Sequence, residues 1–120
     1  MKLNHINLQV TDVAKAVLFF ETYFNFKCIA VKGDNIIAVL KGIDDFELVL
    51  MQAPKNKQEN IYYPDDFHIG FKQINKQAVD EIYHKLKING IAGGREPGKI
   101  RDGYGFYFHY DAIMIEVGTG

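Results

Sequence analysis

The chain consists of two halves with the same order of sequence patterns, and this internal repeat limits the possible folds more than any other feature. In each half, a strand-like segment with alternating apolar residues precedes a segment with helical spacing, and further strand-like segments follow. The halves cover about residues 1–52 and 64–119, and a polar linker covers about 53–63. Because neither half alone is long enough for a stable core, we expect a single domain over residues 1–120.

The first half predicts one strand, one helix and then two or three strands. Residues 3–10 alternate between apolar and polar side chains, which indicates a strand with one apolar face. A Thr-Asp pair then supplies an N-cap for a helix that ends near Asn25. Strands are predicted over 35–40 and 46–51, separated by a loop. The apolar residues that mark the helix are Val13, Val17, Phe20 and Phe24.

The second half begins with a strand that starts at His68, and a second amphipathic helix follows it. An Asn-Gly pair closes this helix in the manner of a glycine C-cap. A glycine-rich, basic loop covers residues 93–102, and residues 105–110 and 112–117 predict a hairpin. The apolar residues that mark the second helix are Val79, Ile82 and Leu86.

Composition is ordinary for a soluble globular protein and excludes several classes of partner. The formal net charge is -1, so there is no broad basic face for nucleic acid. No apolar run is long enough to span a membrane, and the first residues lack the regions of a secretory signal peptide. The single Cys28 has no partner for an internal disulfide, which is typical of a reducing compartment. We therefore expect a cytoplasmic protein without nucleic-acid or membrane partners.

Four side chains with metal-binding groups occupy matching places in the two halves. Each half opens with a strand-borne His, His5 or His68, and closes with a strand-borne Glu, Glu47 or Glu116. Because strand side chains alternate between faces, all four are expected on the sheet face away from the helices. A lone carboxylate inside an apolar strand is costly unless it is paired, hydrogen-bonded or bound to a metal. The four residues therefore predict a divalent-metal site, for which Ni, Zn, Co, Mn and Fe are all chemically plausible.

Taken singly, each of these residues has an ordinary structural explanation. His5 would be a hydrogen-bonded histidine near a strand end, and His68 a surface imidazole paired with a nearby aspartate. Glu47 would be an edge-strand charge that discourages aggregation, and Glu116 would face solvent. The shared orientation and the repeated order favour the metal site over four separate explanations.

Aromatic and sulfur-containing side chains are candidates for a substrate pocket. Tyr104 and Tyr107, with Met51 and Met114, would supply apolar walls with a few polar groups. The alternative is that aromatic residues here pack in the sheet or in a subunit contact, which strand propensity also favours. We prefer that alternative for the Phe residues and leave both explanations open for the Tyr residues.

With these residues in view, the whole chain resembles the vicinal oxygen chelate superfamily. This superfamily includes glyoxalase I, fosfomycin-resistance transferases, bleomycin-binding proteins and extradiol dioxygenases. The resemblance implies an α+β fold of two βαβββ modules, which form a curved mixed sheet around a cleft with the helices on the outer face. The segments that carry the resemblance are Asn4–Val13, Phe19-Phe20, Tyr23-Phe24, Phe67–Phe71, Phe106–Phe108 and Ile115–Val117.

The resemblance also implies roles for the four candidate ligands. His5, His68 and Glu116 match positions that many metal-dependent members share, and Glu47 matches the fourth ligand of glyoxalase I-like members. It implies a lyase or isomerase of glyoxalase I type that acts on a small metabolite or thiol conjugate. A carboxylate ligand would then act as the general base, and Glu116 and Glu47 are unranked candidates for it.

Two other functions fit the same resemblance. One is a metal-free protein of bleomycin-resistance type, which sequesters a drug or metabolite. The other is a fosfomycin-type thiol transferase that uses only His5, His68 and Glu116 as ligands. The resemblance further implies a homodimer, and leaves open whether one chain or two form the site.

The chain departs from the family pattern in two places. The turn before the final strand is His109-Tyr110-Asp111-Ala112 instead of an Asp-Pro-Asp-Gly type, which we expect to alter the hairpin because Ala tolerates positive φ poorly. The chain also lacks an obvious set of basic residues for glutathione. Arg95, Lys99 and Arg101 in the glycine-rich loop are candidates for contact with the substrate, but flexible surface charge explains them equally well.

Overall fold

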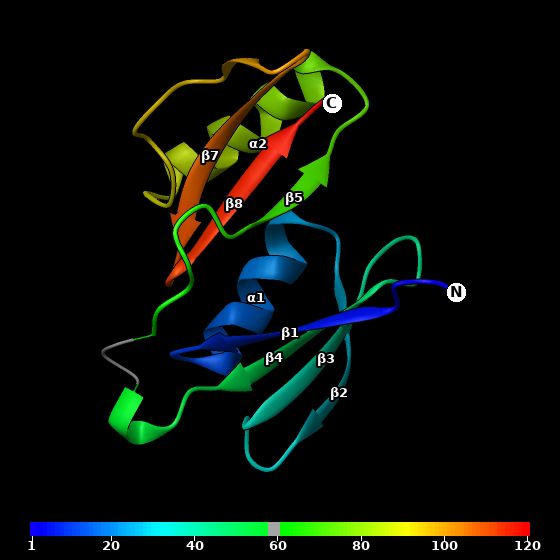
Figure 1. Cartoon of the computed structure of the whole chain (residues 1–120), viewed down its shortest axis with the longest axis vertical. Coiled ribbons are helices and arrows are strands. Elements are labelled where there is room, and N and C mark those ends of the chain that lie inside the picture. The colour runs from blue at the N-terminus through cyan, green and yellow to red at the C-terminus, as the bar shows by residue number, and fades with distance from the viewer. Residues whose placement is uncertain (58–60) are drawn as a thin grey trace. The chain divides into compact units, whose positions relative to one another are not determined.

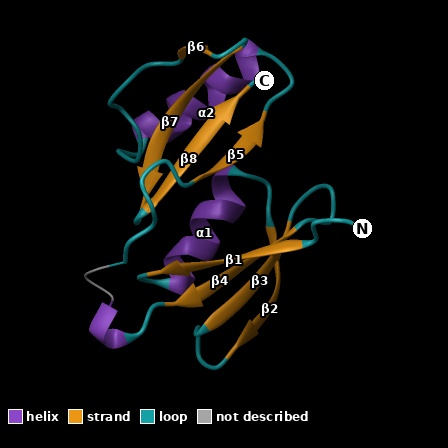
Figure 2. Ribbon diagram, viewed as in Figure 1, coloured by secondary structure: helices purple, strands orange, loops and turns teal. Residues whose placement is uncertain are grey.

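Two four-stranded sheets, each with one helix, make up the computed structural model, which describes residues 1–57 and 61–120. Contacts divide the chain into two units, Met1–Ile61 and Tyr62–Gly120. Each unit has the order strand, helix, three strands (Figures 1 and 2), so the predicted α+β fold of two βαβββ modules is confirmed. Part of the predicted linker, residues 58–60, lies outside the described residues. That the two units form a single domain stays a prediction.

The first unit is a mixed sheet in the order β1-β4-β3-β2. Strands β1 and β4 are parallel, and the other neighbouring pairs are antiparallel. Helix α1 contacts β2, β3 and β4. A short 3-10 helix follows the sheet. The elements are β1 (His5–Val10), α1 (Val13–Tyr23), β2 (Lys27–Lys32), β3 (Ile37–Lys41), β4 (Glu47–Gln52) and η1 (Lys55–Lys57).

Helix α1 begins and ends as the sequence predicts. The Asp12 carboxylate accepts a hydrogen bond of 3.0 Å from the backbone N–H of Lys15, which satisfies one of the free donors of the first turn. The helix ends before Phe24, and Asn25 follows with a positive φ of 57°. The buried face differs in part, because Val17 is only half-buried. The buried residues of α1 are Val13, Ala16, Phe19 and Phe20.

The turn between β2 and β3 is longer than the sequence predicts. Gly33, Asp34 and Asn35 all have positive φ, at 62°, 52° and 63°. Glycine, aspartate and asparagine tolerate this left-handed region better than other residues. The strand expected over 35–40 therefore begins at Ile37.

The second unit repeats the arrangement with the order β5-β8-β7-β6. Strands β5 and β8 are parallel, and helix α2 contacts β7 and β8. The predicted glycine-rich loop contains a short strand, β6. The elements are β5 (His68–Lys72), α2 (Lys76–Ile88), β6 (Gly98–Ile100), β7 (Gly103–Tyr110) and β8 (Ile113–Gly118).

The turn between β7 and β8 corrects one expectation. The positive φ of this hairpin lies at Asp111, with a value of 55°, and not at Ala112. The Asp111 carboxylate accepts a 2.8 Å hydrogen bond from the N–H of Ala112. An alanine at position 112 therefore causes no backbone strain, and the hairpin forms without the Pro and Gly of the family pattern.

Helix α2 ends at the predicted Asn-Gly pair, and the structure also shows its N-cap. The Asn75 side chain caps it through a 2.9 Å bond from the N–H of Ala78, and Gly90 follows it with a φ of 72°. Tyr83, rather than the predicted Ile82, completes the buried face with Val79 and Leu86. No helix in the described part of the chain is long and apolar enough to cross a membrane.

Each sheet buries only the face that its helix covers. In β4 and β8, every second side chain is buried against the helix and the intervening ones are half-exposed. We call the second face of each sheet its open face. Its position follows from the period of two in a strand. The fully buried strand residues include Leu8, Val10, Leu40, Leu50, Ile113, Ile115 and Val117.

Gly105 of β7 provides a test of the packing within the second sheet. A Cβ added there would lie 2.2 Å from the carbonyl oxygen of Val117, which a backbone atom has little freedom to avoid. We expect Gly105→Ala to lower the free energy of unfolding by about 1–3 kcal/mol in urea titrations. Gly98, its register partner on β6, has nothing within 4 Å of an added Cβ. Gly98→Ala is the control, and equal midpoints for the two variants would contradict the prediction.

Candidate metal centre

In the first unit, one imidazole and one carboxylate lie side by side on the open face. His5 is the first residue of β1, Glu47 is the first residue of β4, and the two are register partners. Leu48, the next residue on β4, is 2% exposed and packs on the helix side. His5 and Glu47 therefore point away from α1, as strand alternation requires. His5 is exposed and Glu47 is half-buried.

The His5 ring has an oxygen partner for one of its two nitrogens. Its Nδ1 lies 3.1 Å from Oδ1 of Asn4. Because this amide oxygen only accepts hydrogen bonds, a neutral His5 ring would carry its proton on Nδ1 and keep a lone pair on Nε2. Histidines that bind metals usually donate their second ring N–H to an oxygen in this way.

In the second unit, His68 and Glu116 share the open face of their sheet. His68 is the first residue of β5 and the register partner of Met114, and Glu116 lies two residues further along β8. The Nδ1 of His68 lies 2.8 Å from the carbonyl oxygen of Asp66. As in His5, the ring donates through Nδ1 and leaves Nε2 with its lone pair. Both predicted histidine ligands therefore have the same tautomer.

Glu116 is held by two donors on its own unit. The Nη2 of Arg101 donates to both carboxylate oxygens, at 2.9 Å and 3.1 Å, and the hydroxyl of Tyr107 donates to Oε1. Burial raises the pKa of Glu116, but the hydrogen bonds from Tyr107 and Arg101 and the charge of Arg101 outweigh it. The pKa therefore lies below its ordinary value. Glu116 is an oriented carboxylate at neutral pH.

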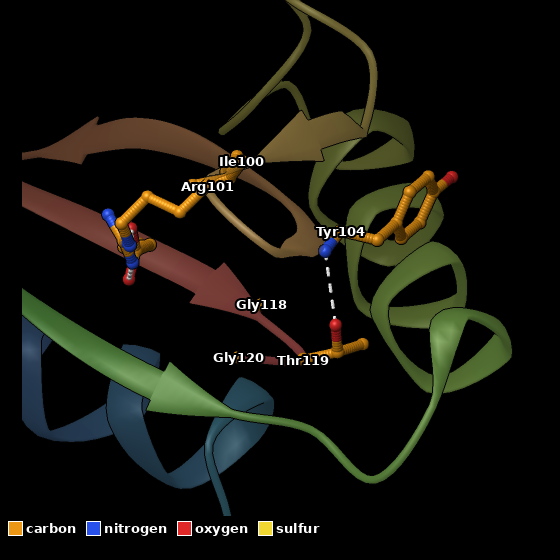
Figure 3. A pocket seen from close by; sticks show the side chains of 7 residues that line it. Ile100, Arg101, Tyr104, Gly118, Thr119 and Gly120 are labelled. Carbon is orange, nitrogen blue, oxygen red and sulfur yellow. Dashed lines mark hydrogen bonds and ion pairs between the residues drawn. The ribbon is translucent and has the colours of Figure 1, made fainter.

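Two of the predicted pocket residues, Tyr104 and Tyr107, lie on different faces of the second sheet. Tyr104 and Tyr107 are three residues apart on β7, so they point to opposite faces. The Tyr104 hydroxyl donates to Asp80 of α2 at 2.6 Å, on the helix side, whereas Tyr107 lies beside Glu116. Figure 3 shows the side chains of Arg101 and Tyr104 pointing in different directions. The alternation of side chains along β7 would have predicted from the sequence that the two tyrosines point to opposite faces.

The two methionines lie on the open faces. Met114 of β8 has His68 and His109 as register partners, so it lies on the same face as Glu116. Met51 of β4 is on the same face as Glu47 and is the register partner of Gln9.

A small depression lies beside Glu116. Its empty volume is about 170 Å³ with open solvent included. Pockets that enclose a small-molecule ligand usually measure about 300–1,000 Å³. This depression is therefore too small to enclose a substrate within the second unit. Its lining residues are Ile100, Arg101, Tyr104, Glu116, Gly118, Thr119 and Gly120.

Glycines next to Glu116 are a feature that the sequence prediction missed. Gly70 is the register partner of Glu116, and a Cβ there would lie 3.5 Å from its Oε2. Gly105 and Gly118 are register partners in the next row, where the Val117 backbone already comes close to Gly105. Glycine within a strand often marks a place where a ligand or another backbone comes close, which is the signal that would have found them.

The donor groups fit a divalent metal but are divided between the units. Each unit supplies one imidazole and one carboxylate. No group of three or more His, Cys, Asp and Glu side chains gathers in the part of the chain that the structure describes. Protein metal sites usually have three or four protein ligands. Each unit alone therefore supplies fewer ligands than such a site usually has.

Comparison with known proteins identifies the family. The model of the Glyoxalase/Bleomycin resistance protein/Dioxygenase superfamily matches residues 2–117. The chain belongs to this superfamily, and the resemblance inferred from its sequence is confirmed.

Several relatives are similar over almost the whole chain. The fosfomycin resistance protein FosX of Listeria innocua is 29% identical over 124 residues, which cover 98% of this chain and 89% of that protein. The structure of a possible glyoxalase from Bacillus cereus is 37% identical with a TM-score of 0.83, and the match covers 98% of this chain and 97% of that one. A FosX variant from Listeria monocytogenes in complex with Mn(II) and 1S,2S-dihydroxypropylphosphonic acid matches with a TM-score of 0.79 at 24% identity, over 99% and 92% of the two chains. This last likeness shows a shared fold.

The bond from Tyr104 to Asp80 gives a test of a structural role for Tyr104. The hydrogen bond to this carboxylate, together with burial, raises the pKa of Tyr104 above its ordinary value. The stabilisation is therefore complete below the unfolded pKa near ~10 and is lost as pH rises through the higher folded pKa. We expect Tyr104→Phe to lower the free energy of unfolding by about 1–2 kcal/mol at pH 7, and the difference to shrink above about pH 10. Denaturant titrations at several pH values measure it.

The control for Tyr104→Phe is Tyr62→Phe. Tyr62 is 84% exposed, so its hydroxyl is already solvated and its loss should leave stability unchanged. A Tyr104→Phe variant as stable as wild type at pH 7 would contradict a structural role for the hydroxyl.

Proposed function

We propose that this protein is a divalent-metal-dependent enzyme that acts on a small oxygenated molecule, with His5, His68 and Glu116 as metal ligands. The observation that carries the proposal is that the two imidazoles have the same kind of hydrogen bond. In each, Nδ1 faces an oxygen acceptor, so that Nε2 is available for a metal. Glu116 adds an ionised, oriented carboxylate. A bound divalent ion would polarise substrate oxygens and stabilise negative charge on them.

Manganese is the first metal to test. Nickel, zinc, cobalt and iron also suit two imidazoles and one carboxylate. The FosX structure with Mn(II) supports manganese, since FosX of Listeria innocua is similar over 98% of this chain.

Glu47 is the better candidate for the general base. Both oxygens of Glu116 accept hydrogen bonds from Arg101, and the lowered pKa makes Glu116 the weaker base. No hydrogen bond or ion pair involves the Glu47 side chain among the described residues, and Glu47 lies opposite His5 on the open face. A half-buried carboxylate without such donors can accept a proton from a substrate carbon or from water. This ranks two residues that the sequence left equal.

Two reaction classes fit this arrangement. A lyase or isomerase of glyoxalase I type would use Glu47 as a ligand that also moves the proton, and the likeness to the possible glyoxalase supports it. A fosfomycin-type enzyme would use three ligands, and the likeness to FosX supports that alternative. Assays with methylglyoxal plus several thiols, and with fosfomycin with and without thiols, distinguish them. A homodimer stays a prediction of the sequence.

Metal binding is the first test of the proposal. His5→Ala and His68→Ala should each weaken Mn²⁺ binding by more than about 100-fold, because losing a ligand costs more than losing an outer partner. Calorimetric titration and elemental analysis measure the loss. His84→Ala is the matched control, since His84 is an exposed histidine on α2. Stoichiometric, tight metal in either ligand variant would remove that residue from the centre.

Glu47 distinguishes the two reaction classes. Glu47→Gln should reduce turnover by about 10²–10⁴-fold, the usual contribution of a general base. Unchanged metal content in this variant indicates three ligands, and loss of metal indicates the four-ligand centre of glyoxalase I type. Asp45→Asn is the control, because Asp45 is an exposed carboxylate with a positive φ that asparagine tolerates. Wild-type turnover by Glu47→Gln would show that Glu47 is not the base.

A further inference from the structure

A tight turn with an unfavourable backbone conformation comes directly before His68. Residues 64–67 form it, and the N–H of Phe67 donates a 3.0 Å hydrogen bond to the carbonyl oxygen of Pro64. The third residue of the turn, Asp66, has a φ of 67°. Glycine is favoured at such a position, and an aspartate occupies it only at a cost in free energy. Other contacts must therefore stabilise this turn.

The same turn sets the direction of the His68 ring. The carbonyl oxygen of Asp66 lies 2.8 Å from Nδ1 of His68 and is the partner that orients the imidazole. This carbonyl belongs to the peptide unit in the middle of the turn, so its direction depends on the backbone conformation of Asp66. If the turn changed conformation, His68 would lose the hydrogen bond that distinguishes its two ring nitrogens.

Two aromatic rings at the ends of the turn stack on each other. The centroids of the Tyr63 and Phe67 rings are 5.0 Å apart, and the angle between the ring planes is 12°. Both side chains are half-buried, whereas the residues between them, 64–66, are all exposed. Packing of the turn residues themselves therefore gives little support. The stabilisation from one aromatic pair is of the same order as the cost of one strained residue.

We propose that Tyr63 and Phe67 are positioning residues for His68, and that their stack holds the turn in the conformation that aims the Asp66 carbonyl at Nδ1. The inference rests on the proposed function, since it takes His68 to be a metal ligand. With Nδ1 held by this acceptor, Nε2 is left for the metal. Hydrogen bonds from a ligand to an outer partner affect metal affinity. The two aromatic residues thus act on the metal site through the orientation of His68.

The competing explanation is that the two rings only cover apolar surface before β5. A substitution at Asp66 separates the two explanations. Glycine adopts a positive φ without strain and keeps the backbone carbonyl, so a turn with Asp66→Gly no longer needs the stack. Asp66→Gly should therefore rescue a variant without the stack only if the stack acts through the turn.

The first measurement is NMR of the metal-free full chain with ¹⁵N-labelled histidine. At about pH 9, well above the ordinary histidine pKa, the spectra report which ring nitrogen carries the proton. Phe67→Leu should lower the ratio of Nδ1–H to Nε2–H forms of His68 by about three- to tenfold, as expected for the loss of one hydrogen bond. Adding Asp66→Gly should restore the ratio to within about twofold of wild type.

Two controls come from the same chain. The acceptor for His5 is the side chain of Asn4, so the His5 signals should stay the same in every variant. Tyr62→Leu is the matched substitution, because Tyr62 is next to the stacked pair but is 84% exposed. It should leave the His68 ratio at the wild-type value.

Tyr63→Leu tests the stack from its other side. It should shift the His68 ratio in the same direction as Phe67→Leu, and the double variant should shift it no further, because both substitutions remove the same contact. Circular dichroism confirms that each variant is folded. Tyr63→Leu also keeps the inference testable if Phe67→Leu does not fold.

Metal affinity is the second measurement. Phe67→Leu should bind Mn²⁺ about tenfold more weakly than wild type, at the lower end of the range for loss of an outer hydrogen bond. Asp66→Gly in the same chain should restore the affinity, whereas Tyr62→Leu should not change it. Calorimetric titration measures all four proteins.

The outcomes separate the inference from the proposed function. A wild-type His68 ratio in folded Phe67→Leu or Tyr63→Leu overturns the inference, and so does a shifted ratio that Asp66→Gly fails to restore. If the ratio responds as expected but wild type binds no divalent metal, the stack orients His68 and the proposed function fails. If wild type binds Mn²⁺ and Phe67→Leu binds it equally well, only the inference fails.

Discussion

The alternation of side chains in strands that bury one face is the constraint on which the rest of the structure depends. Leu48 and Leu50 of β4, and Ile115 and Val117 of β8, pack on the helix side at 0–2% exposure. The side chains between them must point to the open face. A register shift of one residue would move a carboxylate into the apolar core and a large apolar side chain into water, both at high cost. The core therefore holds the candidate ligands in place without contacting them.

The two carboxylates differ in how the fold treats them. Glu116 is 12% exposed, and it is stable as an anion because Arg101 and Tyr107 donate to it. Glu47 is half-buried, and no such donor is described for it. The hydrogen bonds keep Glu116 ionised, as a metal ligand must be. A carboxylate without such donors, such as Glu47, is better suited to accept a proton. The two units thus have the same order of elements, but their carboxylates have different hydrogen-bond partners.

The sequence predicts the repeated elements well because their signals are local. The cap at Asp12 and the alternation in β1, β4 and β8 follow from short-range chemistry, and the structure agrees with them. Strand β2 is less distinct because Ile29 and Val31 are about half-exposed and its pairing shifts near Cys28. The Arg101–Glu116 pair joins residues 15 positions apart through a turn whose φ no sequence pattern gives. Side-chain contacts that depend on such turns require the structure.

The Nδ1 atoms of the two histidines have oxygen partners of different kinds, which bears on how the centre can change. The acceptor for His68 is the backbone carbonyl of Asp66, so most substitutions at that position would keep it, provided that they tolerate the φ of 67°. The acceptor for His5 is the side chain of Asn4, and any residue without an oxygen there removes it. Outer hydrogen bonds of this kind set ring orientation and basicity. The hydrogen bond that orients His68 therefore tolerates most substitutions of Asp66, whereas a single substitution at Asn4 can change the orientation and basicity of His5.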